Sequence, residues 1–173
     1  LEVKTVVKKD TNWLMNTTIA TNYDEICFAV RGDSKYAELV VANEAGIVSQ
    51  VRMDGKINSY ALTKDYILCG LRDWEETGKC HILRYDFKAD EKENFSTQGE
   101  LYRMCGGTKN DALCVDMHFN IYRIDGDAGR LEKINGVFGF ANMPVVFRPI
   151  FDNQVICAYL KDDIYSYYLL RLE

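Results

Sequence analysis

Short apolar runs alternate with polar turns along the whole chain, and no stretch keeps the three-to-four-residue spacing of an amphipathic helix. Many of these runs are rich in Val, Ile, Tyr and Phe, the residues that favour strands. Asp54-Gly55 and Asn135-Gly136 are dipeptides typical of tight hairpins. The pattern therefore predicts an all-β fold.

One short strand recurs four times in similar form. In each copy a cysteine follows two residues that are mostly large and apolar, and a small or medium residue comes next. The steps between these cysteines are 42, 45 and 43 residues. The four copies are residues 25–30, 66–71, 111–117 and 154–160, and their cysteines are Cys27, Cys69, Cys114 and Cys157. We expect the four cysteines to occupy equivalent buried sites in successive units.

A repeat of about 40–45 residues is typical of β-propeller blades with four strands each. The 173 residues then form one domain of four units, with approximate bounds 10–54, 55–105, 106–136 and 137–173. The last unit is one outer strand short, and residues 3–9 have the length and alternation to supply it. We therefore predict a four-bladed β-propeller in which the N-terminal strand completes the last blade and removes its open edge.

Two details of this assignment concern the second and third units. Residues 88–99 are highly charged and are predicted to form a long loop. Residues 100–104 are predicted to be a short outer strand of the second unit, which leaves the third unit compressed.

The repeat plan resembles the β-propeller superfamily in general. Residues 66–70, followed by residues 78–85, are similar to blades of the large scaffold propellers in nuclear protein complexes. The Trp-Asp dipeptide of WD40 blades does not end the third strands. A fragment of a larger propeller would show the same repeats, and a β-sandwich or a lipocalin-like barrel remains an alternative for any chain rich in strands.

Composition narrows the classes of partner and chemistry. A net charge of −5 and a sequence pI of about 5.1 argue against nucleic acid or an acidic membrane as the partner. No apolar run approaches the roughly 18 residues of a membrane-spanning helix. No zinc spacing, phosphate loop or nucleophile elbow is present, so we expect no cofactor, no metal and no enzymatic activity.

The six cysteines bear on the compartment. Cys80 and Cys105 break the repeat and could pair, whereas the four repeated cysteines are predicted to keep free thiols. Free thiols favour the reducing cytoplasm slightly over secretion. The sequons at Asn16 and Asn94 matter only for a secreted chain, so the compartment stays open.

The candidate binding surface is the face where second strands turn into third strands. These turns place a basic residue before an acidic one, and Trp74 adds an aromatic anchor of the type that dominates interface energies. The predicted contact residues are Arg31, Asp33, Arg72, Asp73, Trp74, Lys161 and Asp162. The leading hypothesis is a non-catalytic scaffold module that binds a protein partner through this face.

Two alternatives use the same residues. Residues 31–34 read Arg-Gly-Asp-Ser and resemble the cell-attachment tetrapeptide of matrix proteins, which would indicate an extracellular adhesion or carbohydrate-binding domain. Residues 72–78 resemble the Arg-Asp-Pro segment of five-bladed glycosidases without its proline, which would indicate a degenerate propeller glycosidase. Because the basic-then-acidic pair recurs at equivalent turns, we favour ordinary turn chemistry for both.

Overall fold

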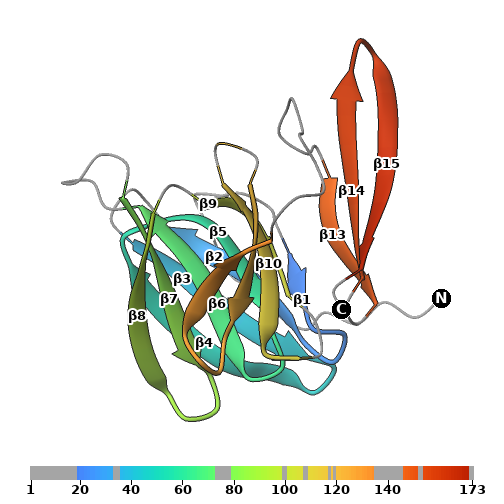
Figure 1. Ribbon diagram of the computed structural model, residues 1–173. Coiled ribbons are helices and arrows are strands. Elements are labelled where there is room, and N and C mark those ends of the chain that lie inside the picture. Colours follow the sequence, from blue (N-terminus) through green and yellow to red (C-terminus); the bar gives the residue numbers. More distant parts are fainter. Residues whose placement is uncertain are drawn as a thin grey trace.

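Four antiparallel sheets make up the computed structural model of the chain (Figure 1). The structure describes residues 19–32, 36–72, 79–98, 101–106, 109–116, 118, 120–134, 146–151 and 154–171. Three sheets have four strands and one has three, and within every sheet the strands pair in chain order. This is the order of propeller blades, so the all-β propeller prediction is confirmed.

Each sheet is named here as a blade. Blade 1 comprises β1 (Ala20–Thr21), β2 (Ile26–Gly32), β3 (Tyr36–Asn43) and β4 (Gly46–Asp54). Blade 2 comprises β5 (Lys56–Leu62), β6 (Tyr66–Arg72), β7 (Lys79–Asp86) and β8 (Glu91–Gln98). Blade 3 comprises β9 (Leu101–Cys105), β10 (Asp111–Asp116), β11 (Ile121–Asp125) and β12 (Arg130–Lys133). Blade 4 comprises β13 (Val146–Phe151), β14 (Gln154–Lys161) and β15 (Ile164–Arg171).

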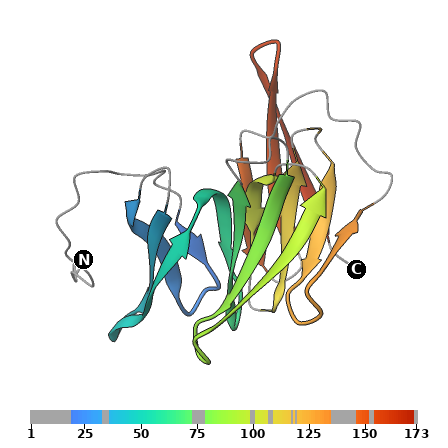
Figure 2. The same ribbon diagram turned by 90° about the vertical axis from the view of Figure 1, so that its left-hand side faces the viewer.

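The blades stand side by side in chain order. Blades 1, 2 and 3 appear as neighbouring sheets in Figure 2, and the first strands β1, β5, β9 and β13 contact one another in sequence. In both views the β14–β15 hairpin projects beyond the other three sheets. The predicted N-terminal strand, residues 3–9, lies outside the described residues, so completion of blade 4 by that strand stays a prediction.

A side-chain turn closes the outer hairpin of each complete blade. Asn43, Asp86 and Asp125 end the third strands of blades 1, 2 and 3. Each accepts a hydrogen bond from a backbone N–H of the following turn, at 2.8, 2.8 and 2.9 Å. The Asn or Asp side chain pairs a backbone N–H of the turn that would otherwise lack an acceptor, and so stabilises the chain reversal. The reversed chain then continues as the fourth strand beside the third.

The prediction for residues 88–104 was wrong. Residues 91–98 form β8, the outermost strand of blade 2, and pair with β7 along its whole length. Residues 101–105 form β9, which is the innermost strand of blade 3 rather than an outer strand of unit two. An outermost strand needs backbone partners on one side only and is mostly exposed, so its polar composition resembled that of a loop.

The four repeated cysteines all lie on second strands and are fully buried, as predicted. Their equivalence holds for only three of them. Cys69, Cys114 and Cys157 pack towards the preceding blade, whereas Cys27 packs towards the following blade and belongs to the same cluster as Cys69. In blade 1 the cysteine is therefore shifted by one residue along the second strand relative to the cysteines of the other three blades. A shift of one residue moves a strand side chain to the opposite face.

The core consists of the layers between blades. Between blades 1 and 2 the largest cluster includes Leu39, Met53, Leu62 and Ile67. A second cluster joins blade 2 to blade 3, and a third joins blade 3 to blade 4. Burial of each such Leu or Ile side chain contributes roughly 1.5–3 kcal/mol, so these layers are the main source of stability among the described residues.

The pairing of Cys80 with Cys105, which the sequence left possible, is not formed. Cys105 is a buried free thiol in the layer between blades 3 and 4, where it packs with Cys157 and Leu113. Cys80 lies on β7 of blade 2, opposite Thr97 of β8. Strand β9 thus turns Cys105 away from the blade that carries Cys80.

Candidate functional site

Antiparallel pairing sorts the connections of each blade onto two opposite ends. The second strands end at Gly32, Arg72, Asp116 and Lys161, and the end of the blades that these residues mark is called the loop face here. The turns between first and second strands and between third and fourth strands lie at the other end, called the turn face here. The described residues of the turn face are 22–25, 44–45, 63–65, 87–90, 106, 109–110 and 126–129.

The predicted contact residues belong to the loop face by topology. Arg31 lies near the end of β2, while Arg72 and Lys161 are the last residues of β6 and β14. Asp162 is exposed in the turn after β14 and adopts a positive φ of 49°. Asp33, Asp73 and Trp74 lie outside the described residues. Common placement at one end of the blades follows for the described members, and a shared contact surface stays a prediction.

Blade 3 adds a loop-face feature that the sequence reasoning missed. Asp116 ends β10 and is buried, and its carboxylate accepts hydrogen bonds from the backbone N–H groups of His118 and Asn120 at 2.8 and 2.9 Å. It also accepts bonds from the Asn120 side-chain amide at 2.8 Å and from the Tyr122 hydroxyl at 3.0 Å. An Asp at a strand end, four residues before Asn, was the available signal in the sequence.

The electrostatics of Asp116 follow from these four bonds. Burial by itself would raise the pKa of this carboxyl, but hydrogen bonds from Asn120, Tyr122 and His118 outweigh it and hold the pKa below its usual range. Burial and the bond to Asp116 raise the pKa of Tyr122 to about 12. Asp116 is therefore an ionised acceptor that orders the loop, and its lone pairs face protein donors rather than a ligand.

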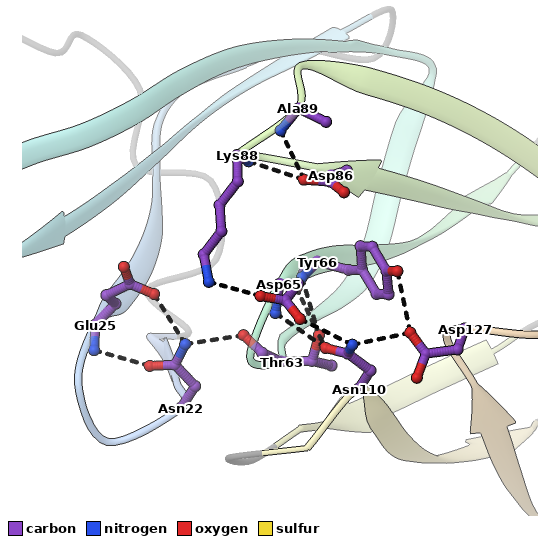
Figure 3. Close-up of polar contacts among 10 residues, drawn as sticks. All are labelled: Asn22, Glu25, Thr63, Asp65, Tyr66, Asp86, Lys88, Ala89, Asn110 and Asp127. Atoms are coloured by element: carbon purple, nitrogen blue, oxygen red, sulfur yellow. Dashed lines mark hydrogen bonds and ion pairs between the residues drawn. The ribbon is translucent and has the colours of Figure 1, made fainter.

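The turn face carries the most extensive described polar network, drawn in Figure 3. At its centre, the Asn110 side-chain amide donates to Asp65 at 3.0 Å and to Asp127 at 2.9 Å. Its carbonyl oxygen accepts the backbone N–H of Asp65 at 3.0 Å and is 3.5 Å from the Thr63 hydroxyl. One side chain of blade 3 thus holds the first turn of blade 2 against its own hairpin turn.

Two further contacts extend the network, one of them to blade 1. The Asn22 amide donates to the carbonyl oxygen of Thr63 at 2.8 Å, which joins blade 1 to blade 2. The Lys88 ammonium donates to Asp65 at 2.6 Å, and this bond, followed by that from Asn110, lowers the pKa of Asp65. The same bond raises the pKa of Lys88.

The outer part of the network is built on a close backbone approach. Tyr66 donates its hydroxyl hydrogen to Asp127 at 3.0 Å, and the Arg84 guanidinium lies 5.0 Å from the centre of the Tyr66 ring. Arg84 also donates to the carbonyl oxygens of Gly126 and Asp127 and pairs with Glu93. A Cβ added to Gly126 would lie 2.2 Å from the Asn110 carbonyl oxygen, so this position requires glycine.

The chemistry open to these groups is limited by their mutual pairing. The described carboxylates of the network accept hydrogen bonds from protein donors, and in the described part of the chain no three His, Cys, Asp or Glu residues are grouped to hold a metal ion.

Burial raises the pKa of Cys157 to about 12 and the pKa of Cys69 still further. These two thiols are therefore protonated at neutral pH and are poor nucleophiles.

Among the described residues, no helix is long and apolar enough to cross a bilayer.

Comparison with known proteins gives the fold. No family model and no curated protein matches the sequence. The β-propeller domain of Cps50 (Swd1) from Myceliophteria thermophila superposes with a TM-score of 0.52 at 11% identity, over 82% of this chain and 48% of that one. The N-terminal domain of Nup159 superposes with the same TM-score and identity, over 90% of this chain and 41% of that one. The chain has a β-propeller fold.

A third similar structure is an uncharacterized protein of Listeria monocytogenes, with a TM-score of 0.48 and 14% identity over 95% of this chain. The chain spans less than half the length of the Swd1 and Nup159 domains that it matches. At these identities the likeness concerns the fold alone.

Proposed function

We propose that the chain is a non-catalytic binding module that engages a protein partner through its loop face. The observation that supports the proposal is that the second strands β2, β6, β10 and β14 all end on the same side of the blades, so the loops that follow them are expected on one face. Loops held on a rigid β scaffold are the usual place for binding residues. The turn face is less suited, because its polar side chains are engaged in joining blades 1, 2 and 3.

The chemistry of the loop face favours a protein surface of mixed charge. Basic residues end the second strands of blades 2 and 4, and the sequence places acidic residues immediately after them. Trp74 stands in the longest of these loops by sequence and would supply the aromatic anchor. Such a mixture of Arg, Asp and Trp is typical of protein interfaces, where a few aromatic and Arg side chains supply most of the affinity.

The proposal is tested by affinity capture with the purified chain as bait and quantitative mass spectrometry of the retained proteins. We expect the double variant Arg72→Ala, Trp74→Ala to retain the partner about ten-fold less than the natural sequence, because loss of one anchor costs about 1.4 kcal/mol or more. Lys109→Ala on the exposed turn face is the matched control and should retain it fully.

Equal retention by the double variant and the natural sequence would contradict the proposal. So would equal losses in the double variant and the Lys109→Ala control. Circular dichroism and the urea midpoint of each variant show whether its fold is intact before capture is compared.

A further inference from the structure

Blade 4 has one face that packs on blade 3 and one that packs on no described blade. Val155 and Cys157 point towards blade 3 and belong to the cluster with Leu113 and Val115. The opposite face, called the outer face of blade 4 here, is mostly apolar and partly exposed. Its exposed apolar members alternate along the three strands and are Val146, Leu160, Tyr165, Tyr167 and Leu169, and the exposed Arg148 of β13 lies on the same face. The rings of Tyr165 and Tyr167 are stacked, with centroids 6.3 Å apart.

Strand register shows what this face corresponds to in the other blades. Four cross-strand pairs hold the same place between second and third strands: Ala29–Leu39, Gly70–Ile82, Val115–Ile121 and Ala158–Tyr167. Val115–Ile121 ends the described pairing of β10 with β11, and the other three pairs lie within their ladders. All four point in the direction of the following blade.

Burial at these four places differs sharply. The third-strand residues Leu39, Ile82 and Ile121 are 0%, 0% and 9% exposed, because the next blade covers each of them. Tyr167 is 65% exposed. The outer face of blade 4 therefore corresponds by register to the covered interblade faces of the other blades. Its second-strand residue Ala158 is buried, but its third-strand residue Tyr167 is exposed where the equivalent residues of the other blades are buried.

The unpaired edge of blade 4 also indicates that part of this blade lacks a described partner. By register β15 is a third strand, since Gln154–Arg171 corresponds to Tyr66–Asp86 of blade 2 and Asp111–Asp125 of blade 3. Those third strands are each followed by a paired fourth strand, β8 and β12. Among the described strands nothing pairs with the free edge of β15, which is eight residues long and exposed from Ile164 to Leu169. Long apolar edges of this kind are normally covered in a native protein.

We propose that a further β-propeller blade, supplied by additional sequence of the same protein, covers the outer face of blade 4. The cover is identified by what covers the equivalent faces. Ile82 belongs to one buried cluster with Cys114 and Met104 of blade 3, and Ile121 belongs to another with Val155 and Cys157 of blade 4, so each cover is the apolar inward face of the next blade. The matched propeller domains, of which this chain spans 48% and 41%, have the length for further blades.

The test compares the 173-residue chain with the protein purified from its native source, using tetranitromethane to nitrate exposed tyrosines. In the chain alone we expect Tyr165 and Tyr167 to react readily. In the native protein we expect both to react about ten-fold more slowly, and the intact mass to exceed that of the chain by at least one blade of about 40 residues. Tyr60, which is buried between blades 1 and 2, should stay unreactive in both and reports an intact fold.

Three outcomes would overturn the proposal. Equal nitration of Tyr167 in the two samples would show that the face stays open. Protection in the chain alone would assign the face to a second copy if the mass by sedimentation is dimeric, and to the N-terminal strand predicted at residues 3–9 if the mass is monomeric. Protection in a native protein of 19.9 kDa, present only while a second polypeptide is bound, would assign it to a separate partner.

A substitution gives a second readout. Tyr167→Lys should leave the urea midpoint of the 173-residue chain unchanged and should lower the midpoint of the native protein, because the charge is buried only under a cover. An unchanged midpoint in both contradicts the proposal. Failure of the loop-face capture experiment would leave this result intact, since none of these residues belongs to the loop face.

Discussion

Blade 2 and blade 4 share a strand pattern but differ in their surroundings. Both faces of blade 2 are covered, Cys69 and Leu83 by blade 1 and Leu68 and Ile82 by blade 3. In blade 4, Val155 and Cys157 are buried against blade 3, whereas Tyr165, Tyr167 and Leu169 on the opposite face are exposed. The β14–β15 hairpin projects beyond the other three sheets (Figure 1). The comparison shows that both faces of a blade carry apolar side chains suited to packing against a neighbouring blade. In blade 4 these side chains remain largely apolar on the outer face, although no described blade covers that face.

The largest expected effect comes from truncating the same register position in the two blades. Ile82→Ala should lower the free energy of unfolding by about 2–5 kcal/mol, because it leaves a cavity between blades 2 and 3. Tyr167→Ala should change it by less than about 1 kcal/mol in the 173-residue chain, since an exposed side chain loses little packing. Urea unfolding measures both, and similar losses for the two variants would contradict the comparison.

The next effect concerns the turn face, which joins blades 2 and 3 and has no described counterpart at the outer face of blade 4. Gly126→Ala should cost about 1–3 kcal/mol, because its Cβ would meet the Asn110 carbonyl oxygen and the Tyr66 ring. Ala128→Ser, in the same turn but exposed, is the control and should be nearly neutral. Thermal unfolding distinguishes the two, and an unchanged midpoint for Gly126→Ala would show that the turn can shift.

A smaller effect is expected from Asn110, whose side chain bonds both Asp65 and Asp127. Asn110→Ala should cost about 1–2 kcal/mol, since it removes these bonds and leaves the Asp65 N–H without its acceptor. The neighbouring Lys109→Ala keeps the backbone contact and serves as the control. If the two variants unfold at the same urea concentration, the network does not stabilise the joint between blades 2 and 3.

The smallest predicted effect is a pH dependence at the loop face of blade 3. Because folding lowers the pKa of Asp116, its stabilising contribution is present above the unfolded-state pKa and is lost as pH falls through the lower folded-state pKa. Asp116→Asn should therefore lower stability at neutral pH and flatten the loss of stability on acidification. Urea midpoints at several pH values measure this, with exposed Asp24→Asn as the control. Parallel pH curves for Asp116→Asn and the natural sequence would exclude the contribution.

Much of the fold could be predicted from the sequence because the repeat is strong at second strands. The cysteine-bearing strands fell on β2, β6, β10 and β14, since their apolar side chains are buried whichever blade lies beside them. The direction of Cys27 could not be predicted, because both faces of an inner strand are apolar and periodicity does not mark which is which. Strand β8 was missed because an outermost strand gains its hydrogen bonds from β7 and needs few apolar residues.

The candidate site was harder to predict than the fold. Topology alone placed Arg72, Lys161 and Asp162 at one end of the blades, because every second strand of a propeller ends on the same face. The partners of Asp65, Asn110 and Asp116 could not be predicted, since those contacts join residues that only the packing of blades or the course of a turn brings together. The open face of blade 4 was missed for the same reason.

The central claim is that the third-strand residues at equivalent register positions in the four blades all face the following blade, and that they differ in whether a described blade covers them. Hydroxyl-radical footprinting of the 173-residue chain, with each residue's rate normalised to that in the unfolded chain, tests it most directly. We predict strong protection of Leu39, Ile82 and Ile121 and oxidation of Tyr167 at close to its unfolded rate. Similar protection at all four positions, or a reactive Ile82, would contradict the account.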